Sequence, residues 1–310
     1  ARYSPRGRWG LRPLLTPRAV GAAPATHPAA GGACARYSPR GRRRGRSPWP
    51  GRMAQYGPVC GRYAASRDKA TLITEFDVVK APARDLSPDY NVAPTKEVYA
   101  VADRAPGPAS GEPTDVRREL AIVKWGLVPS WAKDPAIGSR MINARVETLT
   151  EKPAYRRAVA KRRCLLPADG YFEWYEPTEP DAPTGRNGKP LKQPFFIHPA
   201  DGSVLAMAGL YEFWRNPDLP EGDPAAWLWT TTVITTSAPD DLGRIHDRMP
   251  MCVRPEQWDA WLDPDNTDGA EAVSLLTPAA PGWLTAEPVS RLVNNVRNNG
   301  PELLRPAAAE

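Results

Sequence analysis

Apolar residues in this chain gather in short runs that do not alternate strictly with polar ones, a pattern typical of strands buried in a sheet. Clusters of Gly, Pro, Asn and Asp bound most of the runs. The strands that this pattern predicts are 98–102, 120–128, 164–166, 170–175, 194–197 and 227–236.

Segments with the apolar period of a helix are fewer and shorter than the runs that predict strands. Leu72, Ile73 and Phe76 share a helical face, and Ser66 stands where a helix N-cap is expected. A second helix is expected from 150 to 162, because the cationic run 161–163 suits a helix C-terminus. Further helical pieces are expected at 239–242 and 255–262.

Many strands with scattered short helices predict an α+β domain, built on a curved, mostly antiparallel sheet with short flanking helices. Asp201-Gly202 predicts a hairpin, and Pro-rich stretches at 104–115 and 177–193 predict surface loops. No G-x-G-x-x-G or P-loop motif occurs. A doubly wound fold with a nucleotide cofactor is therefore disfavoured, and no cofactor is expected.

This domain is expected to span residues 59–310, because the first 58 residues have a different composition. Pro, Gly and Arg dominate there, and the octapeptide Ala-Arg-Tyr-Ser-Pro-Arg-Gly-Arg occurs at 1–8 and again at 35–42. Such a segment buries too little apolar area to offset the entropy of ordering it. Residues 1–58 are therefore expected to be a disordered extension.

The basic charge of the chain belongs to this extension. It holds 12 Arg and no Asp, Glu or Lys, whereas the whole chain is +6, so residues 59–310 carry a net charge of −6. The overall charge is therefore no argument that the domain binds nucleic acid. A polyanion site on the domain must be a local patch of named residues.

Three interpretations of the extension compete. An Arg-rich nucleic-acid arm and an acid-free transit peptide are two, but the segment has no amphipathic helical period. We favour the third, in which residues 1–58 lie upstream of the biological start or are removed. A GTG codon written as Val59 would initiate as Met, and excision of that Met would leave Cys60 as the first residue.

The cysteines and histidines indicate no metal site. Four Cys, at 34, 60, 164 and 252, and three His, at 27, 198 and 246, include no C-x-x-C pair and no zinc-like spacing. A protein of a reducing cytoplasm fits this usage. No apolar run approaches the ~18 residues of a membrane span, so no membrane partner is expected, and a monomer is sufficient.

Three polar residues stand in settings that favour chemistry. Cys60 lies at the seam between extension and domain, although a free Cys is commonly a small buried apolar residue. Glu173 stands among aromatic residues, where desolvation would raise its pKa for acid or base work, unless it faces outward. His246 is flanked by opposite charges, which suits a proton shuttle or a structural role.

The other candidates are weaker. Asn143 and Arg145 alternate with apolar residues and so face one side of an extended segment, where they can hold a phosphate or sugar, or else cap and salt-bridge. Cys164 and Cys252 lie inside apolar runs and are expected to be structural. His198 is expected at a strand end on the surface.

Taken together, these stretches resemble the SRAP (SOS response-associated peptidase) family of abasic-site DNA-crosslinking proteins. The resemblance covers essentially all of residues 59–310. The blocks that carry it are Cys60-Gly61-Arg62-Tyr63, Tyr90-Asn91-Val92-Ala93-Pro94-Thr95, Trp125-Gly126-Leu127-Val128-Pro129, Ile142-Asn143-Ala144-Arg145-Val146-Glu147-Thr148, Asp169-Gly170-Tyr171-Phe172-Glu173-Trp174, His246-Asp247-Arg248-Met249-Pro250 and Val293-Asn294-Asn295-Val296.

The resemblance implies a single SRAP-like domain in which Cys60 is a catalytic N-terminal cysteine, with Asn143, Glu173 and His246 completing the site. It implies single-stranded DNA with abasic sites as the partner, in the cytoplasm and at the nucleoid. The contacts to DNA that it implies are Arg62, Asn91, Trp131, Arg145 and Thr235. One departure is that 59 residues precede the cysteine, which in the family follows the initiator Met.

The implied reaction is a crosslink in which the α-amine and the thiol of an N-terminal cysteine close a thiazolidine on the sugar aldehyde. An internal cysteine cannot do this, because its nitrogen is an amide. Two other functions stay open. One is a cysteine peptidase with Cys60 as nucleophile and His246 as base, acting on itself or on other proteins. The other is a non-covalent single-stranded DNA-binding module.

Overall fold

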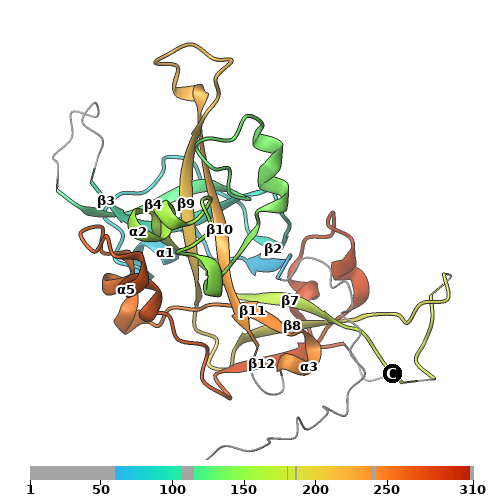
Figure 1. Ribbon diagram of the computed structural model, residues 1–310. Coiled ribbons are helices and arrows are strands. Elements are labelled where there is room, and N and C mark those ends of the chain that lie inside the picture. Colours follow the sequence, from blue (N-terminus) through green and yellow to red (C-terminus); the bar gives the residue numbers. More distant parts are fainter. Residues whose placement is uncertain (1–59, 106–114, 180, 186, 239–241, 308–310) are drawn as a thin grey trace, which may run out of the picture. The chain divides into compact units, whose positions relative to one another are not determined.

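A computed structural model describes residues 60–105, 115–179, 181–185, 187–238 and 242–307. Its strands form two sheets (Figure 1). The first sheet has the order β12-β8-β7-β1-β2. Its strands are β1 (Tyr63–Ala65), β2 (Asp89–Val92), β7 (Gly170–Tyr175), β8 (Gln193–Pro199) and β12 (Leu284–Pro288).

The second sheet closes on itself. Five of its strands follow the order β10-β4-β3-β6-β9, and β9 pairs again with β10. The ring consists of β3 (Glu97–Arg104), β4 (Arg117–Trp125), β6 (Arg163–Ala168), β9 (Leu205–Arg215) and β10 (Trp227–Ser237). Two short strands, β5 (Asn143–Arg145) and β11 (Arg248–Pro250), extend the sheet by pairing with β10.

The predicted fold class is confirmed, with one difference. The pairings are mostly antiparallel, and β10 runs parallel only to β4 and β5 among the described strands. We expected one curved sheet, whereas the strands divide between an open sheet and a ring. A strongly twisted sheet can close in this way, because closure removes its exposed edges.

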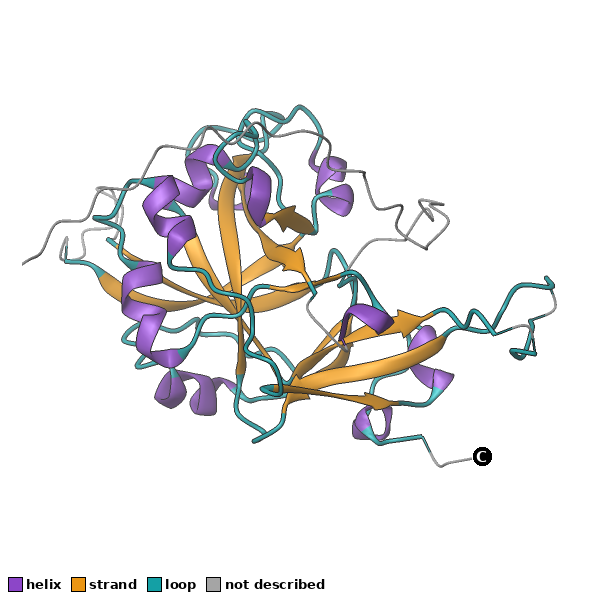
Figure 2. Cartoon of the chain, turned by 60° about the horizontal axis from the view of Figure 1, so that its bottom comes forward, coloured by secondary structure: helices purple, strands orange, loops and turns teal. Residues whose placement is uncertain are grey.

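Short helices cover the outer side of the ring (Figure 2). They are α1 (Lys69–Glu75), α2 (Arg156–Lys161), α4 (Trp258–Leu262) and α5 (Gly269–Ser274), and a fifth helix, α3 (Leu242–Ile245), packs against β7. Leu72, Val159 and Trp261 from these helices join Val101 and Leu165 of the ring in one buried cluster. The apolar face of each helix thus has a partner, as the helical period requires.

The opposite face of the ring strands carries a second cluster, which continues into the open sheet. Cys164 and Leu166 of β6 and Val98 of β3 belong to it, and so do Tyr63 of β1 and Tyr171 of β7. Cys60 is a fully buried member of this cluster. Cys60, at the boundary between the extension and the domain, therefore lies where the two sheets meet.

Two local predictions for helices need correction. Asp68, and not Ser66, caps α1, because its carboxylate accepts a hydrogen bond from the Thr71 N–H at 2.8 Å. The helix expected from 150 begins only at Arg156. Pro153 explains the late start, since the residue before a proline is disfavoured in the helical region.

The prediction that α2 ends in a cationic run is confirmed, and Arg163 at the end of this run contacts the last carbonyls of the helix. Arg163 is 3 % exposed, and its guanidinium donates to the carbonyls of Val159 at 2.9 Å and Ala160 at 3.0 Å. It also donates to the carbonyls of Trp261 at 2.6 Å and of Asp263. One buried cation thus caps α2 and fastens α4 to it.

The predicted hairpin at Asp201-Gly202 is wrong. Gly202 does turn the chain, with φ of +70°, but the strands on its two sides belong to different sheets: β8 pairs with β7 and β12, and β9 pairs with β6 and β10. The turn therefore connects the open sheet to the ring. Of the other predicted features, 239–241 and most of the loop at 104–115 lie outside the described residues.

Candidate active site

Cys60 presents its backbone nitrogen to a buried carboxylate. The Cys60 N–H donates to Glu173 Oε1 at 2.5 Å, and both residues are almost fully buried. Strand pairing creates this contact, because Tyr63 of β1 stands opposite Tyr171 of β7. Cys60 also has φ of +47°, a left-handed conformation that costs energy for any residue but glycine.

Glu173 is 3 % exposed, so it does not face outward. Along β7 it shares a side with Tyr171, which belongs to the same cluster as Cys60. Burial raises the pKa of its carboxyl from 4.5 to about 8, against the hydrogen bonds from the Cys60 and Trp174 N–H groups, and the Asp247 charge raises it further. The sequence interpretation of a desolvated carboxylate is confirmed.

His246 follows α3, which packs against β7, so the fold brings its turn to the strand that carries Glu173. Its Nδ1 accepts a hydrogen bond from the Arg248 N–H at 3.1 Å. A neutral ring that accepts this bond carries its proton on Nε2. Burial lowers the pKa of His246 below 6.5, and the carboxylate of Asp247, 3.0 Å from Nδ1, opposes that shift.

Asn143 begins β5, which runs parallel to β10 with Asn143 opposite Val233. The preceding residue, Ile142, belongs to the same buried cluster as Cys60, and its carbonyl accepts from the Trp125 indole at 3.0 Å. The Asn143 carbonyl accepts from the Tyr155 hydroxyl at 3.3 Å. The segment that carries Asn143 is thus fixed from two sides beside the cluster around Cys60.

The thiol of Cys60 sits in an apolar enclosure. Its pKa is raised well above 9.0, chiefly by burial and next by the charge of Glu173. Cys164 and Cys252 are also free and buried, and burial raises the pKa of each to about 12. Only Cys60 combines a buried thiol with a backbone nitrogen on a carboxylate, among the cysteines in the described part of the chain.

Two residues implied as DNA contacts lie beneath the surface. Asn91 is fully buried, and its side-chain amide donates to the carbonyls of Val293, Asn295 and Asn298 at 3.1 to 3.2 Å. Thr235 is 2 % exposed, and its carbonyl accepts from the Arg248 guanidinium at 2.7 Å. This placement suits positioning roles better than direct contact.

The other three implied contacts differ in access. Trp131 is 62 % exposed and Arg145 is exposed. Arg62 is partly buried, donates to Asn91 Oδ1 at 2.7 Å and to the Val293 carbonyl at 2.9 Å, and lies over the Trp174 ring. Trp131 and Arg145 are therefore free to meet a ligand, whereas Arg62 is already engaged.

An ion pair that the sequence did not predict joins the segment that carries Asn143 to the segment that carries His246. Arg248 makes a two-pronged ion pair with Glu147 at 2.6 and 3.0 Å, while its own backbone N–H orients the His246 ring. Glu147 follows β5, and Arg248 begins β11. Both residues stand inside the motif blocks, but their pairing spans 101 positions, so no local pattern indicates it.

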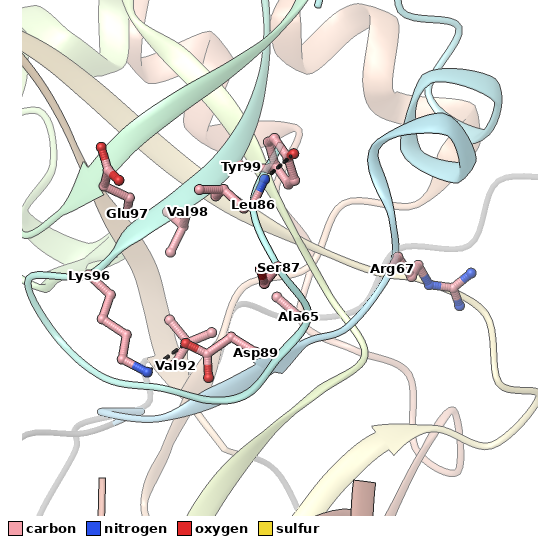
Figure 3. Close-up of a pocket in the computed structure, with 10 residues that line it drawn as sticks. All are labelled: Ala65, Arg67, Leu86, Ser87, Asp89, Val92, Lys96, Glu97, Val98 and Tyr99. Atoms are coloured by element: carbon pink, nitrogen blue, oxygen red, sulfur yellow. Dashed lines mark hydrogen bonds and ion pairs between the residues drawn. The ribbon is translucent and has the colours of Figure 1, made fainter. Parts of the chain in front are cut away.

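The structure also has a pocket of about 230 Å³ (Figure 3). Its wall includes Lys96 and Asp89, which neutralise each other at 2.5 Å, and Tyr99, whose hydroxyl accepts from the Leu86 N–H. None of the nine predicted site residues lines it. Within the described ranges there is no group of His, Cys, Asp and Glu able to hold a metal ion, and no helix long and apolar enough to cross a membrane.

The chain is similar in sequence to proteins of a known family. The profile of the SOS response associated peptidase (SRAP) family matches residues 59–296. The chain is 37% identical over 247 residues to the abasic site processing protein YoqW of Bacillus subtilis, covering 79% of this chain and 99% of that protein. It is 33% identical to the abasic site processing protein YedK of Escherichia coli, covering 80% and 100%.

A further relative and a solved structure agree. The abasic site processing protein HMCES of Gallus gallus is 34% identical over 242 residues, covering 71% of this chain and 66% of that protein. A crystal structure of a Bacteroides thetaiotaomicron protein shares the fold with a TM-score of 0.63 at 24% identity, covering 80% of this chain and all of that one. Since the family profile matches most of the chain and the Bacillus subtilis and Escherichia coli relatives match along nearly their full lengths, this protein belongs to the SRAP family.

Proposed function

We propose that this protein processes abasic sites in single-stranded DNA by forming a covalent crosslink through Cys60 as its N-terminal residue. The observation that carries the proposal is the 2.5 Å contact between the Cys60 nitrogen and the Glu173 carboxylate, beside a buried thiol. The relatives named as abasic site processing proteins support DNA lesions as the substrate class. Cys60, Glu173, His246 and Asn143 are the residues that we assign to the reaction.

Two groups of one residue would act in sequence. The neutral α-amine attacks the aldehyde of the ring-opened sugar and forms an imine with loss of one water. The thiol then adds its sulfur to the imine carbon and its proton to the nitrogen, which closes a five-membered thiazolidine. An α-amine has a pKa near ~8 and is partly neutral at cellular pH, unlike a lysine amine near ~10.4.

The surroundings of Cys60 favour this order of steps. Burial disfavours both an ammonium on the nitrogen and a thiolate on the sulfur, so the amine is the better first nucleophile. The raised pKa of Glu173 lets its carboxyl give and take protons near neutral pH while the imine forms. His246, with its proton on Nε2, would assist opening of the sugar, and Asn143 would orient the sugar oxygen or the N-terminus.

The proposal requires that the bond before Cys60 is never made or is cut. In the 310-residue chain the Cys60 nitrogen is an amide and cannot form an imine. Either initiation at Val59 with removal of Met, or hydrolysis of the Val59–Cys60 bond by the protein itself, would supply the amine. The family match begins at residue 59, which supports a mature chain without residues 1–58.

The test compares protein beginning at Cys60 with the 310-residue chain, each incubated with abasic and intact single-stranded oligonucleotides. Denaturing electrophoresis should show an adduct only for the chain beginning at Cys60 and only with the abasic strand. Its mass should equal protein plus DNA minus one water. Cys60→Ala should abolish the adduct, and Cys252→Ala, another buried thiol, should leave it intact.

The same experiment separates the alternatives. Crosslinking by Cys60→Ala would refute the assignment. Equal affinity for abasic and intact strands without any adduct would indicate a non-covalent binding module. Loss of residues 1–59 from the 310-residue chain, dependent on Cys60, would reveal an autopeptidase step that precedes crosslinking.

A further inference from the structure

A loop near the C-terminus is a cationic surface segment of a domain whose net charge is negative. From Val289 to Gly300 the sequence has two arginines, four asparagines and no acidic residue, whereas residues 59–310 carry a net charge of −6. Both arginines, Arg291 and Arg297, are exposed. A polyanion approaching this domain would find favourable charge here.

The loop also exposes apolar side chains. Leu292 is 54 % exposed and Val296 is 46 % exposed, and they flank the fully buried Val293. Val289 and Val293 of the loop pack in a buried cluster with Phe172 and Phe196 of the open sheet, and Leu292 and Val296 take no part in this cluster. Cations beside exposed apolar side chains match the chemistry of a single strand, which offers phosphates and unstacked bases.

Buried groups hold this loop in one conformation. Asn91 donates to three of its carbonyls, and Arg62 donates to the carbonyl of Val293. The Trp174 indole donates to Asn294 Oδ1 at 2.7 Å. A contact surface fixed before binding loses little entropy when the ligand arrives.

The same hydrogen bonds tie the loop to the reactive residues. Arg62 stands two positions after Cys60, and Trp174 directly follows Glu173. The strands that position the reacting groups therefore also position the loop. This coupling gives Arg62 and Asn91, which are buried or engaged, a way to influence DNA binding without touching DNA.

We propose that residues 291–297 form a direct contact surface for single-stranded DNA, with Arg291 and Arg297 on phosphates and Leu292 and Val296 against a base. The inference rests on the proposed function for its partner. It reassigns Asn91 from a DNA contact to the residue that shapes this surface.

The test uses the 310-residue chain and an intact single-stranded oligonucleotide, so that affinity is measured without crosslinking. The variants are Arg291→Glu with Arg297→Glu, and Leu292→Ala with Val296→Ala. Their matched controls are Arg156→Glu with Arg157→Glu on the exposed face of α2, and Val79→Ala, a valine that is 71 % exposed. Residues 1–58 are the same in every protein, so differences in affinity report on the domain.

The charge-reversed loop should bind about tenfold more weakly, and the slope of log affinity against log salt should fall by about 0.7 for each lost phosphate contact. The apolar double variant should lose about threefold in affinity with an unchanged salt slope. Irradiation with a 5-iodouracil oligonucleotide should label the peptide that contains 291–297. Affinity and slope equal to those of the α2 control, or label confined to other peptides, would overturn the inference.

The DNA-affinity test of the loop can succeed or fail independently of the crosslinking test of the proposed function. If no protein forms an adduct with abasic DNA while the loop variants still lose affinity, the chemistry fails and the surface stands. If Leu292→Ala with Val296→Ala changes the oligomeric state and leaves DNA affinity unchanged, the apolar pair belongs to a contact between copies, and the assignment to DNA is refuted.

Discussion

Replacing Glu173 by glutamine should make the protein more stable at alkaline pH and less able to crosslink. The carboxyl has a pKa of about 8 in the folded protein against 4.5 as its ordinary value. The folded state therefore holds the proton more tightly, and the native protein loses stability as pH rises from 4.5 to about 8. A shift of that size corresponds to about 5 kcal/mol.

Glutamine removes this titration and keeps an oxygen that can accept from the Cys60 N–H. Its amide N–H₂ needs a partner in the same buried site, which costs about 1–3 kcal/mol. Above pH 8 the variant should therefore be more stable than the native protein by about 2–4 kcal/mol, whereas in acid, where Glu173 is protonated, it should be less stable by about 1–3 kcal/mol. In the chain beginning at Cys60, the same change should slow crosslinking by about 10²–10⁴.

The assay is urea unfolding of the 310-residue chain at about pH 5 and about pH 9, followed by fluorescence of its tryptophans. Glu179→Gln is the control, because hydrogen bonds lower the pKa of that exposed carboxyl and it stays ionised over this range. A stability difference between Glu173→Gln and the native protein that does not change with pH would refute a desolvated carboxyl at this position.

Three further predictions address the groups around the site. Arg163→Met should destabilise the protein by about 3–5 kcal/mol in urea unfolding, because the buried guanidinium serves four carbonyls that would lose their donor; a loss below about 1 kcal/mol would contradict this. Nitrogen NMR of His246 should show the Nε2–H form at neutral pH and a midpoint below 6.5, and a midpoint above 6.5 would show that burial is not dominant. Glu147→Gln should lower the free energy of unfolding by about 1 kcal/mol at neutral pH, since solvent partly screens the ion pair with Arg248. Arg248 lowers the pKa of Glu147, and this loss of stability should disappear as acid protonates the carboxyl. A loss that persists in acid would argue against the ion pair.

The sequence by itself indicated six of the described strands, namely β3, β4, β6, β7, β8 and β10, and the aromatic setting of Glu173. β7 has the bounds that its aromatic run predicts, and the aromatic neighbours of Glu173 indicated a buried carboxyl with a raised pKa as one of two alternatives, of which the structure shows the buried one. These features are local, because a run of apolar residues and the polarity of adjacent residues depend on neighbours in the chain. The ordered motif blocks likewise resemble the SRAP family, and the family profile confirms that resemblance.

Only the tertiary structure decided which polar groups partner each other. Asn91 looked like a ligand contact, but its amide serves carbonyls more than 200 positions away. The Asp201-Gly202 turn looked like a hairpin, but its strands enter different sheets. A buried polar group must find a partner, and distant segments supply that partner once the fold has formed. The contact between the Cys60 nitrogen and Glu173 spans 113 positions, so the sequence could indicate both residues but not their meeting.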